Sequence, residues 1–167
     1  DTPLVMELRE RGSQKVVWRH NDQMTTAEKT IEVSLPQARL WSVDAPNLYE
    51  LTLRLGNDEV KKRFGFRWFE VRTVKGDKQF YLNGKRITLV TAISWSFWPD
   101  NGITPSRELA YKQVRDAKQL GMTMLNFHRT IGNPDVLDAA DELGLLYFEE
   151  PGGNQYPAGK FDDGTHY

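Results

Sequence analysis

The chain has 167 residues, of which 39% are hydrophobic and 27% charged, a composition typical of folded globular proteins rather than disordered segments. Its 22 Lys and Arg nearly balance its 23 Asp and Glu, so no basic excess exists to bind nucleic-acid phosphates. It contains no Cys, which excludes disulfides and Cys-ligated metal sites, and no apolar run approaches the ~18 residues of a membrane span. We therefore expect no nucleic acid, membrane, metal or cofactor.

Residues 1–72 have the pattern of β-strands separated by turns. Strand-like runs, which alternate apolar and polar residues or are rich in β-branched and aromatic ones, cover residues 3–8, 15–19, 30–35, 48–55 and 60–71. The last run is interrupted at Gly65, where we expect a bulge or a bend. Because no helical pattern lies between the runs, they predict an antiparallel β-sandwich.

From residue 73 onward, strands alternate with helices. The Asn83-Gly84 pair between two β-rich runs predicts a tight hairpin, and residues 72–78 are expected to link the two parts of the chain. Three buried strands and two helices then alternate, at residues 87–93, 107–120, 122–127, 134–143 and 145–148. This order predicts parallel strands joined by right-handed crossovers.

Both predicted helices have capping residues at their ends. Ser106 suits the N-cap of the first helix, and Gly121 is expected to be its C-cap. Asn133-Pro134 begins the second helix, because Asn is favoured at the cap and Pro at the first helical position, and this helix ends near Gly144. The face of the first helix that we expect to be buried carries Leu109, Val114, Ala117 and Leu120.

Parallel βα units, whether closed into a barrel or left as an open sheet, place their chemistry at the carboxyl ends of the strands. No glycine-rich phosphate loop follows any of these strands, so a nucleotide site is not expected. The residues there combine indole rings with carboxylates and other polar groups, a set that suits a sugar with its apolar C–H face and its rim of hydroxyls. The candidate substrate-binding residues are Trp95, Trp98, Asn126, His128, Arg129, Glu149 and Glu150.

Each candidate also has a purely structural interpretation. The two Trp side chains suit a core as well as a ligand face. His128 and Arg129 would pair equally well with a local carboxylate. Glu149 and Glu150 are adjacent and point to opposite faces within a strand, so at most one of them faces a pocket at the strand ends.

Four segments together resemble glycoside hydrolase family 2, the family of β-galactosidases and β-glucuronidases. Residues 40–49 (LWSVDAPNLY) and 64–71 (FGFRWFEV) are similar to the end of its immunoglobulin-like domain. Residues 80–87 (FYLNGKRI) resemble the start of its TIM barrel, and residues 141–146 (DELGLL) resemble the end of its second barrel helix. The resemblance covers nearly the whole chain, in the family's order.

The resemblance implies a retaining glycosidase, in which two carboxyl groups about 5–5.5 Å apart act as acid/base and nucleophile. In the family these glutamates follow the fourth and seventh barrel strands, and this chain has no Asn-Glu pair of the acid/base type. No catalytic residue is therefore assigned. Matching strand ends of the family line the sugar subsite, which implies that role for Asn126, His128, Arg129 and either Glu149 or Glu150. The family commonly has Arg where this chain has Asn126.

The expected fold class is multidomain, β plus α/β: an incomplete immunoglobulin-like β-sandwich over residues 1–72, then the first βα units of a TIM (β/α)8 barrel over residues 73–167. A complete barrel needs ~250 residues, so we expect a piece of a longer polypeptide, with the remainder of its own barrel as a partner. The expected function is hydrolysis of O-glycosidic bonds in β-glycosides by the longer protein, with this stretch inactive by itself. The alternative is a non-catalytic carbohydrate-binding or structural β-sandwich module.

Overall fold

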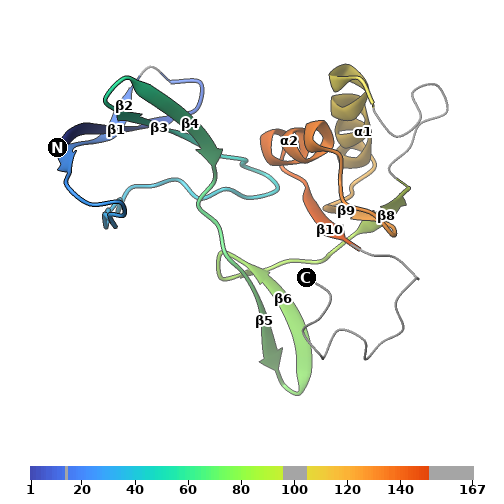
Figure 1. Cartoon of the computed structure of the whole chain (residues 1–167). Coiled ribbons are helices and arrows are strands. Elements are labelled where there is room, and N and C mark those ends of the chain that lie inside the picture. Colours follow the sequence, from blue (N-terminus) through green and yellow to red (C-terminus); the bar gives the residue numbers. More distant parts are fainter. Residues whose placement is uncertain (14, 96–104, 151–167) are drawn as a thin grey trace, which may run out of the picture. The chain divides into compact units, whose positions relative to one another are not determined.

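The structure is a computed structural model that describes residues 1–13, 15–95 and 105–150 (Figure 1). The fold is mostly β, with two α-helices in the described part. The chain divides into two compact units, Asp1–Lys85 and Arg86–Tyr167, which are described in turn. Neither of the described helices is long and apolar enough to cross a membrane.

The first unit is built on a four-stranded antiparallel sheet (Figure 1). Its strands, in the order in which they lie side by side, are β2 (Val16–Met24), β1 (Thr2–Glu10), β3 (Tyr49–Leu55) and β4 (Asp58–Phe64). The register of β1 and β3 places Met6 opposite Leu53, with leucine pairs on either side, so this face of the sheet is apolar. The strands predicted at residues 3–8, 15–19 and 48–55 are confirmed, and the second extends to Met24.

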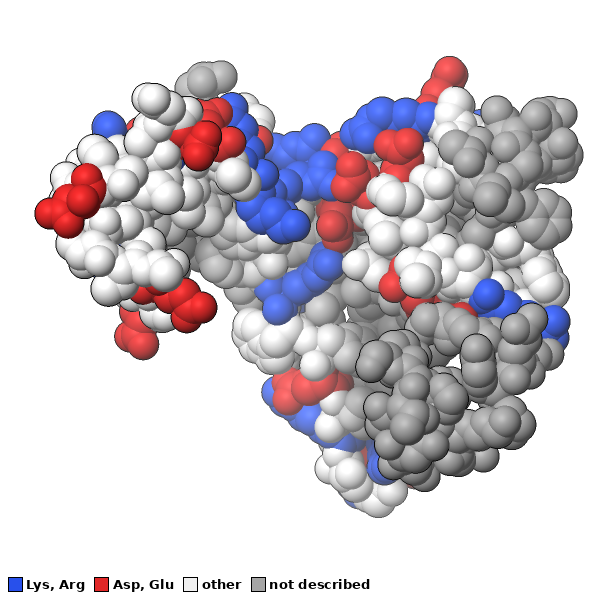
Figure 2. All heavy atoms as spheres, in the orientation of Figure 1, with Lys and Arg blue, Asp and Glu red and all other residues white. Residues whose placement is uncertain are grey.

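The other face of this sheet is polar. Glu7 lies there with only 7% of its surface exposed. Guanidinium nitrogens of Arg9, Arg19 and Arg54 approach its carboxylate at 3.3, 3.5 and 3.6 Å. The hydrogen bond from Arg9 and the positive charges around it hold the pKa of Glu7 below its ordinary value of 4.5. On the molecular face drawn in Figure 2, acidic and basic side chains are interspersed.

The strand predicted at residues 30–35 is wrong. Of the described residues between 25 and 48, only Trp41 and Pro46 form a β-bridge, and it is isolated. Ile31 instead lines a pocket together with apolar side chains of β1 and β3. Val33 is 39% exposed, so the alternating pattern of this segment reflects neither a paired strand nor one buried face.

The predicted run over residues 60–71 is two strands, β4 and β5 (Phe69–Val74), and it is broken after Phe64 as Gly65 suggested. A Cβ atom at Gly65 would lie 2.8 Å from Cβ of Trp41, whose side chain is fully buried. Glycine at this position therefore allows the backbone to pass directly against the buried tryptophan.

Residues 72–78 do not form the expected linker. β5 pairs antiparallel with β6 (Asp77–Leu82), and the same small sheet continues to the two-residue strand β7 (Lys85–Arg86). The expected linker is thus the closed end of a hairpin, which turns at Lys75 and Gly76, both with positive φ. The tight turn predicted at Asn83-Gly84 is confirmed, with φ of 52° and 75°, the signs that a type I′ turn requires.

The second unit contains β8 (Thr91–Ser94), α1 (Arg107–Gln119), β9 (Met124–Phe127), α2 (Pro134–Leu143) and β10 (Leu146–Glu149). The three strands are parallel and lie in the order β8–β9–β10, and both helices lie on the same side of them (Figure 1). Apolar side chains of both helices are buried in one core with Leu125, Phe127 and Leu145. The predicted alternation of parallel strands and helices is confirmed, although the first strand is shorter than its apolar run.

Three of the predicted helix ends are confirmed, whereas the C-cap of α1 is Leu120 and not Gly121. Oγ of Ser106 accepts a hydrogen bond from the N–H of Leu109, which caps α1. Oδ1 of Asn133 accepts one from the N–H of Asp135, which caps α2. Gly144 ends α2 in the left-handed conformation, with φ of 83°.

The buried face of α1 differs from the prediction at its first and last positions, because Leu109 is only half-buried and Leu120 is exposed. The buried residues of α1 are Ala110, Val114 and Ala117. Leu120, expected on this face, is 74% exposed. It is the C-cap residue, where the chain leaves helical geometry, so the helical spacing no longer predicts which way its side chain points.

Candidate functional site

The carboxyl ends of the three parallel strands bring together most of the residues predicted to bind a substrate. Phe127, the last residue of β9, points toward the helices and is buried in their core. The last residues of β8 and β10 lie beside it in register and share that side of the sheet. Successive side chains along a strand point to opposite faces of the sheet. The residue that follows each strand therefore points away from the helices, and these residues are Trp95, His128 and Glu150.

Glu150 is the centre of this group. Its Oε1 accepts a hydrogen bond from Nδ2 of Asn126 at 3.0 Å, and its Oε2 accepts one from the backbone N–H of Arg129 at 3.1 Å. Nδ1 of His128 lies 3.1 Å from the same Oε2. These donors, with the Asn126 amide contributing most, hold the pKa of Glu150 below its ordinary value of 4.5, so the carboxylate is ionised at neutral pH.

Trp95 extends the group on the side of β8. Its ring meets the ring of His128 edge-on, with centroids 4.6 Å apart and planes at 79°. The residue is 56% exposed, so it is not a core residue of the described structure. An exposed indole beside polar groups can pack against the apolar face of a ligand whose polar edge meets those groups.

Asn126 carries a buried oxygen that has no hydrogen-bond partner among the described residues. Its Nδ2 is engaged with Glu150, whereas its Oδ1 is buried and accepts no hydrogen bond from the described part of the chain. Leaving a buried acceptor unpaired costs about 1–3 kcal/mol. We call Trp95, Asn126, His128, Arg129 and Glu150 the strand-end cluster.

Of the other two predicted residues, Glu149 is not in the strand-end cluster. Oε1 of Glu149 accepts a hydrogen bond of 2.9 Å from the N–H of Gly132, in the loop that precedes α2. The side chains of the two adjacent glutamates thus lie on opposite sides of the strand end, as the alternation of side chains along a strand requires. Trp98 lies outside the described residues.

Sequence reasoning missed a second polar contact at the end of β8. Oγ of the buried Ser94 accepts a hydrogen bond of 3.1 Å from Nε2 of Gln113 in α1. Oε1 of Gln113 is buried and has no hydrogen-bond partner among the residues described. The sequence feature that could have indicated this contact is the amide side chain of Gln113, which directly precedes the buried Val114 on a helix that covers the sheet.

The strand-end cluster offers an ionised carboxylate, an imidazole and an exposed indole. No three His, Asp or Glu side chains converge as a metal site requires, in the ranges that the structure describes. Because Glu149 is engaged elsewhere, the cluster has a single carboxylate. Its arrangement can bind a molecule that carries hydroxyl groups next to an apolar face.

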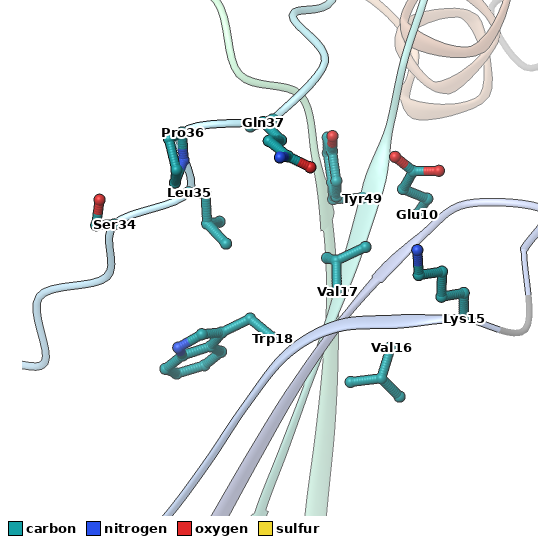
Figure 3. Close-up of a pocket in the computed structure, with 11 residues that line it drawn as sticks. Glu10, Lys15, Val16, Val17, Trp18, Ser34, Leu35, Pro36, Gln37 and Tyr49 are labelled. Atoms are coloured by element: carbon teal, nitrogen blue, oxygen red, sulfur yellow. The ribbon is translucent and has the colours of Figure 1, made fainter.

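The first unit has a pocket of its own, with a volume of about 350 Å³. Figure 3 shows Trp18 and Leu35 on one side of it and Glu10 and Lys15 on the other. Such a combination of apolar walls and a few polar groups is typical of small-molecule sites. Trp18 is not a candidate from the sequence alone, because a lone Trp in a short strand is equally expected in a core.

Comparison with known proteins identifies relatives along most of the chain. The sequence model described as "Glycosyl hydrolases family 2" matches residues 5–67. The β-galactosidase of Thermoanaerobacterium thermosulfurigenes is 37% identical over 131 residues, which cover 74% of this chain and 17% of that protein. The chain spans between 12% and 19% of the length of eight curated relatives that it matches.

Solved structures share the fold. The β-glucuronidase of Parabacteroides merdae superposes with a TM-score of 0.77 at 24% identity, over 91% of this chain and 19% of that one. The β-glucuronidase of Bifidobacterium dentium, complexed with coumarin-3-O-glucuronide, superposes with a TM-score of 0.79 at 21% identity, over 91% of this chain and 25% of that one. At these identities the likeness concerns the fold.

Proposed function

The chain belongs to the family 2 glycoside hydrolases, and we propose that it supplies a sugar-binding edge to a β-glycosidase that cleaves O-glycosidic bonds with retention of configuration. The observation that carries this proposal is the strand-end cluster, in which Glu150, held ionised by Asn126, lies near the exposed indole of Trp95. A pyranose would direct its hydroxyls to the polar groups and its C–H face to the indole. The carboxyl ends of parallel strands are also where βα folds bind their ligands.

The proposal assigns residues 1–72 to an immunoglobulin-like sandwich and residues 73–167 to the first βα units of a TIM barrel. The antiparallel sheet with one apolar face supports the first assignment. The second is supported by three parallel strands in chain order with both helices on one side, because a doubly wound open sheet carries helices on both faces. The hairpin β5–β6 would lead from one domain into the other.

No catalytic residue of this chain is part of the proposal. Retaining hydrolysis needs two carboxyl groups that face one glycosidic bond, about 5–5.5 Å apart. Glu149 and Glu150 are adjacent but are bound to Gly132 and to Asn126, on opposite sides of the strand end. We therefore expect the 167-residue chain to bind a glycoside without cleaving it, and further strands of the barrel to supply the acids.

Two measurements on the purified chain test this function. Incubation with 4-nitrophenyl β-glycosides should release no nitrophenol above the buffer rate, and titration with the same glycosides should show saturable binding. Trp95→Ala should weaken that binding about tenfold, since it removes the stacking face. Trp68→Ala is the matched control, because Trp68 is 49% exposed but lies in the first unit.

Either of two outcomes would contradict the proposal. Cleavage at enzymatic rates would mean that the chain does contain a complete acid pair. An affinity unchanged by Trp95→Ala, or no binding of any glycoside, would remove the sugar site from the strand-end cluster.

A second candidate function is a non-catalytic carbohydrate-binding module centred on the first unit. The pocket beside Trp18 favours it, because an indole wall with nearby Glu10 and Lys15 is also suited to a sugar ring. In that case Trp18→Ala would abolish glycoside binding and Trp95→Ala would leave it unchanged. The same titrations therefore separate the two candidates.

A further inference from the structure

The pocket beside Trp18, which we call the first-unit pocket, has an apolar end and a charged end. Trp18 and Leu35 lie on one side of it, and Glu10 and Lys15 lie on the other (Figure 3). Its wall is completed by further apolar side chains, those of Val16, Val17, Pro36 and Ala38. Its volume of about 350 Å³ is at the small end of the ~300–1,000 Å³ that is typical of ligand pockets, so we expect a small ligand.

The indole wall of this pocket is held in place by its neighbours. The ring of Trp18 is stacked on the ring of His20, with centroids 5.8 Å apart and planes at 4°. Trp18 also lies opposite Leu8 of β1, which is buried. Tyr49, which lines the pocket as well, is buried, and its hydroxyl accepts a hydrogen bond of 2.7 Å from the backbone N–H of Arg39. Trp18 is only half-buried, so part of its surface is available to an apolar group of a ligand.

The charged end of the pocket carries one group of each sign. Glu10 is the last residue of β1 and Lys15 directly precedes β2, so the turn between these strands places both at one end of the sheet. Among the described residues, neither the Glu10 carboxylate nor the Lys15 ammonium forms a hydrogen bond or an ion pair. Arg39, which lines a small cavity together with Glu10, has its guanidinium bound to Oδ1 of Asn47. Both charges can therefore pair with opposite charges of a ligand.

We propose that the first-unit pocket binds a free α-amino acid with a large apolar side chain. The ammonium group of the ligand meets Glu10, its carboxylate meets Lys15, and its side chain packs on Trp18. Lys15 and Trp18 are three residues apart, roughly 10 Å along an extended strand, which the Lys15 side chain and such a ligand span together. A neutral sugar also packs on an indole, but it has no pair of opposite charges for the other end of the pocket.

This inference goes beyond the proposed function and does not depend on it. Every residue that lines the pocket belongs to the first unit, and none belongs to the strand-end cluster. The groups that the ligand meets are accessible, because Lys15 is exposed and Glu10 and Trp18 are half-buried.

The test is a titration of the whole 167-residue chain near neutral pH, in which the indole N–H signal of Trp18 is followed in ¹⁵N–¹H spectra. L-Phenylalanine and L-leucine should shift this signal saturably, with a Kd of about 1 mM or lower, and glycine, which has no apolar side chain, should not. N-acetyl-L-phenylalanine lacks the ammonium and L-phenylalaninamide lacks the carboxylate, so each should bind about threefold more weakly than L-phenylalanine. The two analogues represent the ends of a peptide chain. Tighter binding of either one would mean that the pocket takes a peptide end, which overturns the inference.

Two charge variants show which residue binds each end of the ligand. Glu10→Gln should weaken L-phenylalanine and L-phenylalaninamide about threefold and leave N-acetyl-L-phenylalanine unchanged, because only the first two carry an ammonium group. Lys15→Gln should weaken L-phenylalanine and N-acetyl-L-phenylalanine and leave L-phenylalaninamide unchanged, because only the first two carry a carboxylate. Glu28→Gln and Lys78→Gln are the matched controls, since both residues are exposed in the first unit and lie outside the pocket. Neither control should change any of these affinities.

Three results would overturn the inference and leave the proposed function intact. The first is a Trp18 signal that responds to none of the amino acids. The second is a signal that responds to methyl β-D-galactopyranoside and not to L-phenylalanine, which would favour the carbohydrate-binding module. The third is a loss of affinity in Glu10→Gln or Lys15→Gln that is the same for all three phenylalanine ligands, because the charges would then not bind the ends assigned to them.

Discussion

The side chain of Asn126 donates a hydrogen bond of 3.0 Å to the carboxylate of Glu150 and so joins the ends of two neighbouring parallel strands. The two residues are 24 positions apart in the chain. They meet because β9 and β10 run in the same direction with Phe148 beside Asn126, which brings the residue after the end of β10 next to the amide. This pairing orders the strand-end cluster around one ionised group.

Replacing Asn126 with Leu should raise the pKa of Glu150 toward its ordinary value of 4.5. The amide is the strongest of the donors that lower this pKa, and the Arg129 N–H and His128 would remain. The measurement is a ¹³C titration of the Glu150 carboxyl signal in both proteins. Gln113→Leu should leave the titration where it is, and a pKa unaffected by Asn126→Leu would show that the bond is not formed in solution.

The buried carboxylate of Glu7 should stabilise the first unit in a pH-dependent way. Glu7→Gln removes the negative charge that Arg9, Arg19 and Arg54 approach together, so we expect a lower melting temperature at neutral pH. Glu59→Gln is the matched control, because Glu59 bonds Arg54 at 2.7 Å on the same sheet but its side chain is 40% exposed. Its melting temperature should change less.

The sign of the pH dependence follows from the lowered pKa of Glu7. Its folded pKa lies below the unfolded value of 4.5, so the stabilisation is fully present above pH 4.5 and is lost as the pH falls through the folded pKa. The wild-type melting temperature should therefore drop more steeply on acidification than that of Glu7→Gln. Calorimetry over a series of pH values checks this, and parallel curves would contradict it.

Asn83 should stabilise the first unit both through its backbone conformation and through its side chain. Its Oδ1 accepts a hydrogen bond from the N–H of Trp68 at 3.1 Å, and its Nδ2 donates one to the carbonyl of Trp41 at 2.8 Å. Asn83→Gly keeps the positive φ but loses both bonds, for which we expect a loss of about 1–3 kcal/mol. Asn83→Ala should lose roughly 1–2 kcal/mol more, because Ala resists this φ.

Urea unfolding of the two variants measures this difference. Asn57→Ala, in the exposed turn between β3 and β4, is the control and should stay within about 0.5 kcal/mol of the wild type. Equal stabilities of Asn83→Gly and Asn83→Ala would mean that the left-handed conformation is not retained. A wild-type-like Asn83→Gly would show that the two side-chain bonds contribute nothing.

Gly65→Ala should destabilise the first unit by about 1–3 kcal/mol. The new methyl group would lie 2.8 Å from Cβ of Trp41, an atom that cannot move without its backbone. The indole N–H signal of Trp41 should shift as well, because the ring has to move within its buried site. Gly76→Ala, where no atom lies within 4 Å of the added Cβ, should leave that signal in place, and an unshifted Trp41 in Gly65→Ala would contradict the close approach.

Features that depend on neighbouring residues could be predicted from the sequence. The Ser106 and Asn133 caps and the Asn83-Gly84 turn were recognisable because a side chain there bonds, or a backbone angle is set, within a few positions. The alternation of strands and helices in the second unit followed from patterns of similar local character. These interactions form in the same way wherever the segment lies in a fold.

Predictions failed where a segment's partner was distant or absent. The alternating run over residues 30–35 has the side-chain pattern of a strand, but a pattern does not state which backbone it pairs with. Residues 72–78 contain turn residues, which are as compatible with a hairpin as with a linker, and the pairing of β5 with β6 decides between them. Leu120 has helical spacing but falls at the residue where the helix ends.

The chain's own residues determined that polar and aromatic side chains follow the parallel strands, because strand and helix periodicities are local properties of the chain. Only the tertiary structure decided which of them meet. Glu149 and Glu150 are chemically identical neighbours, and the register of β10 beside β9 directs the first to Gly132 and the second to Asn126. Register is set by contacts between residues far apart in sequence. A shift of β10 by one residue relative to β9 would exchange the faces of the sheet to which the two glutamates point.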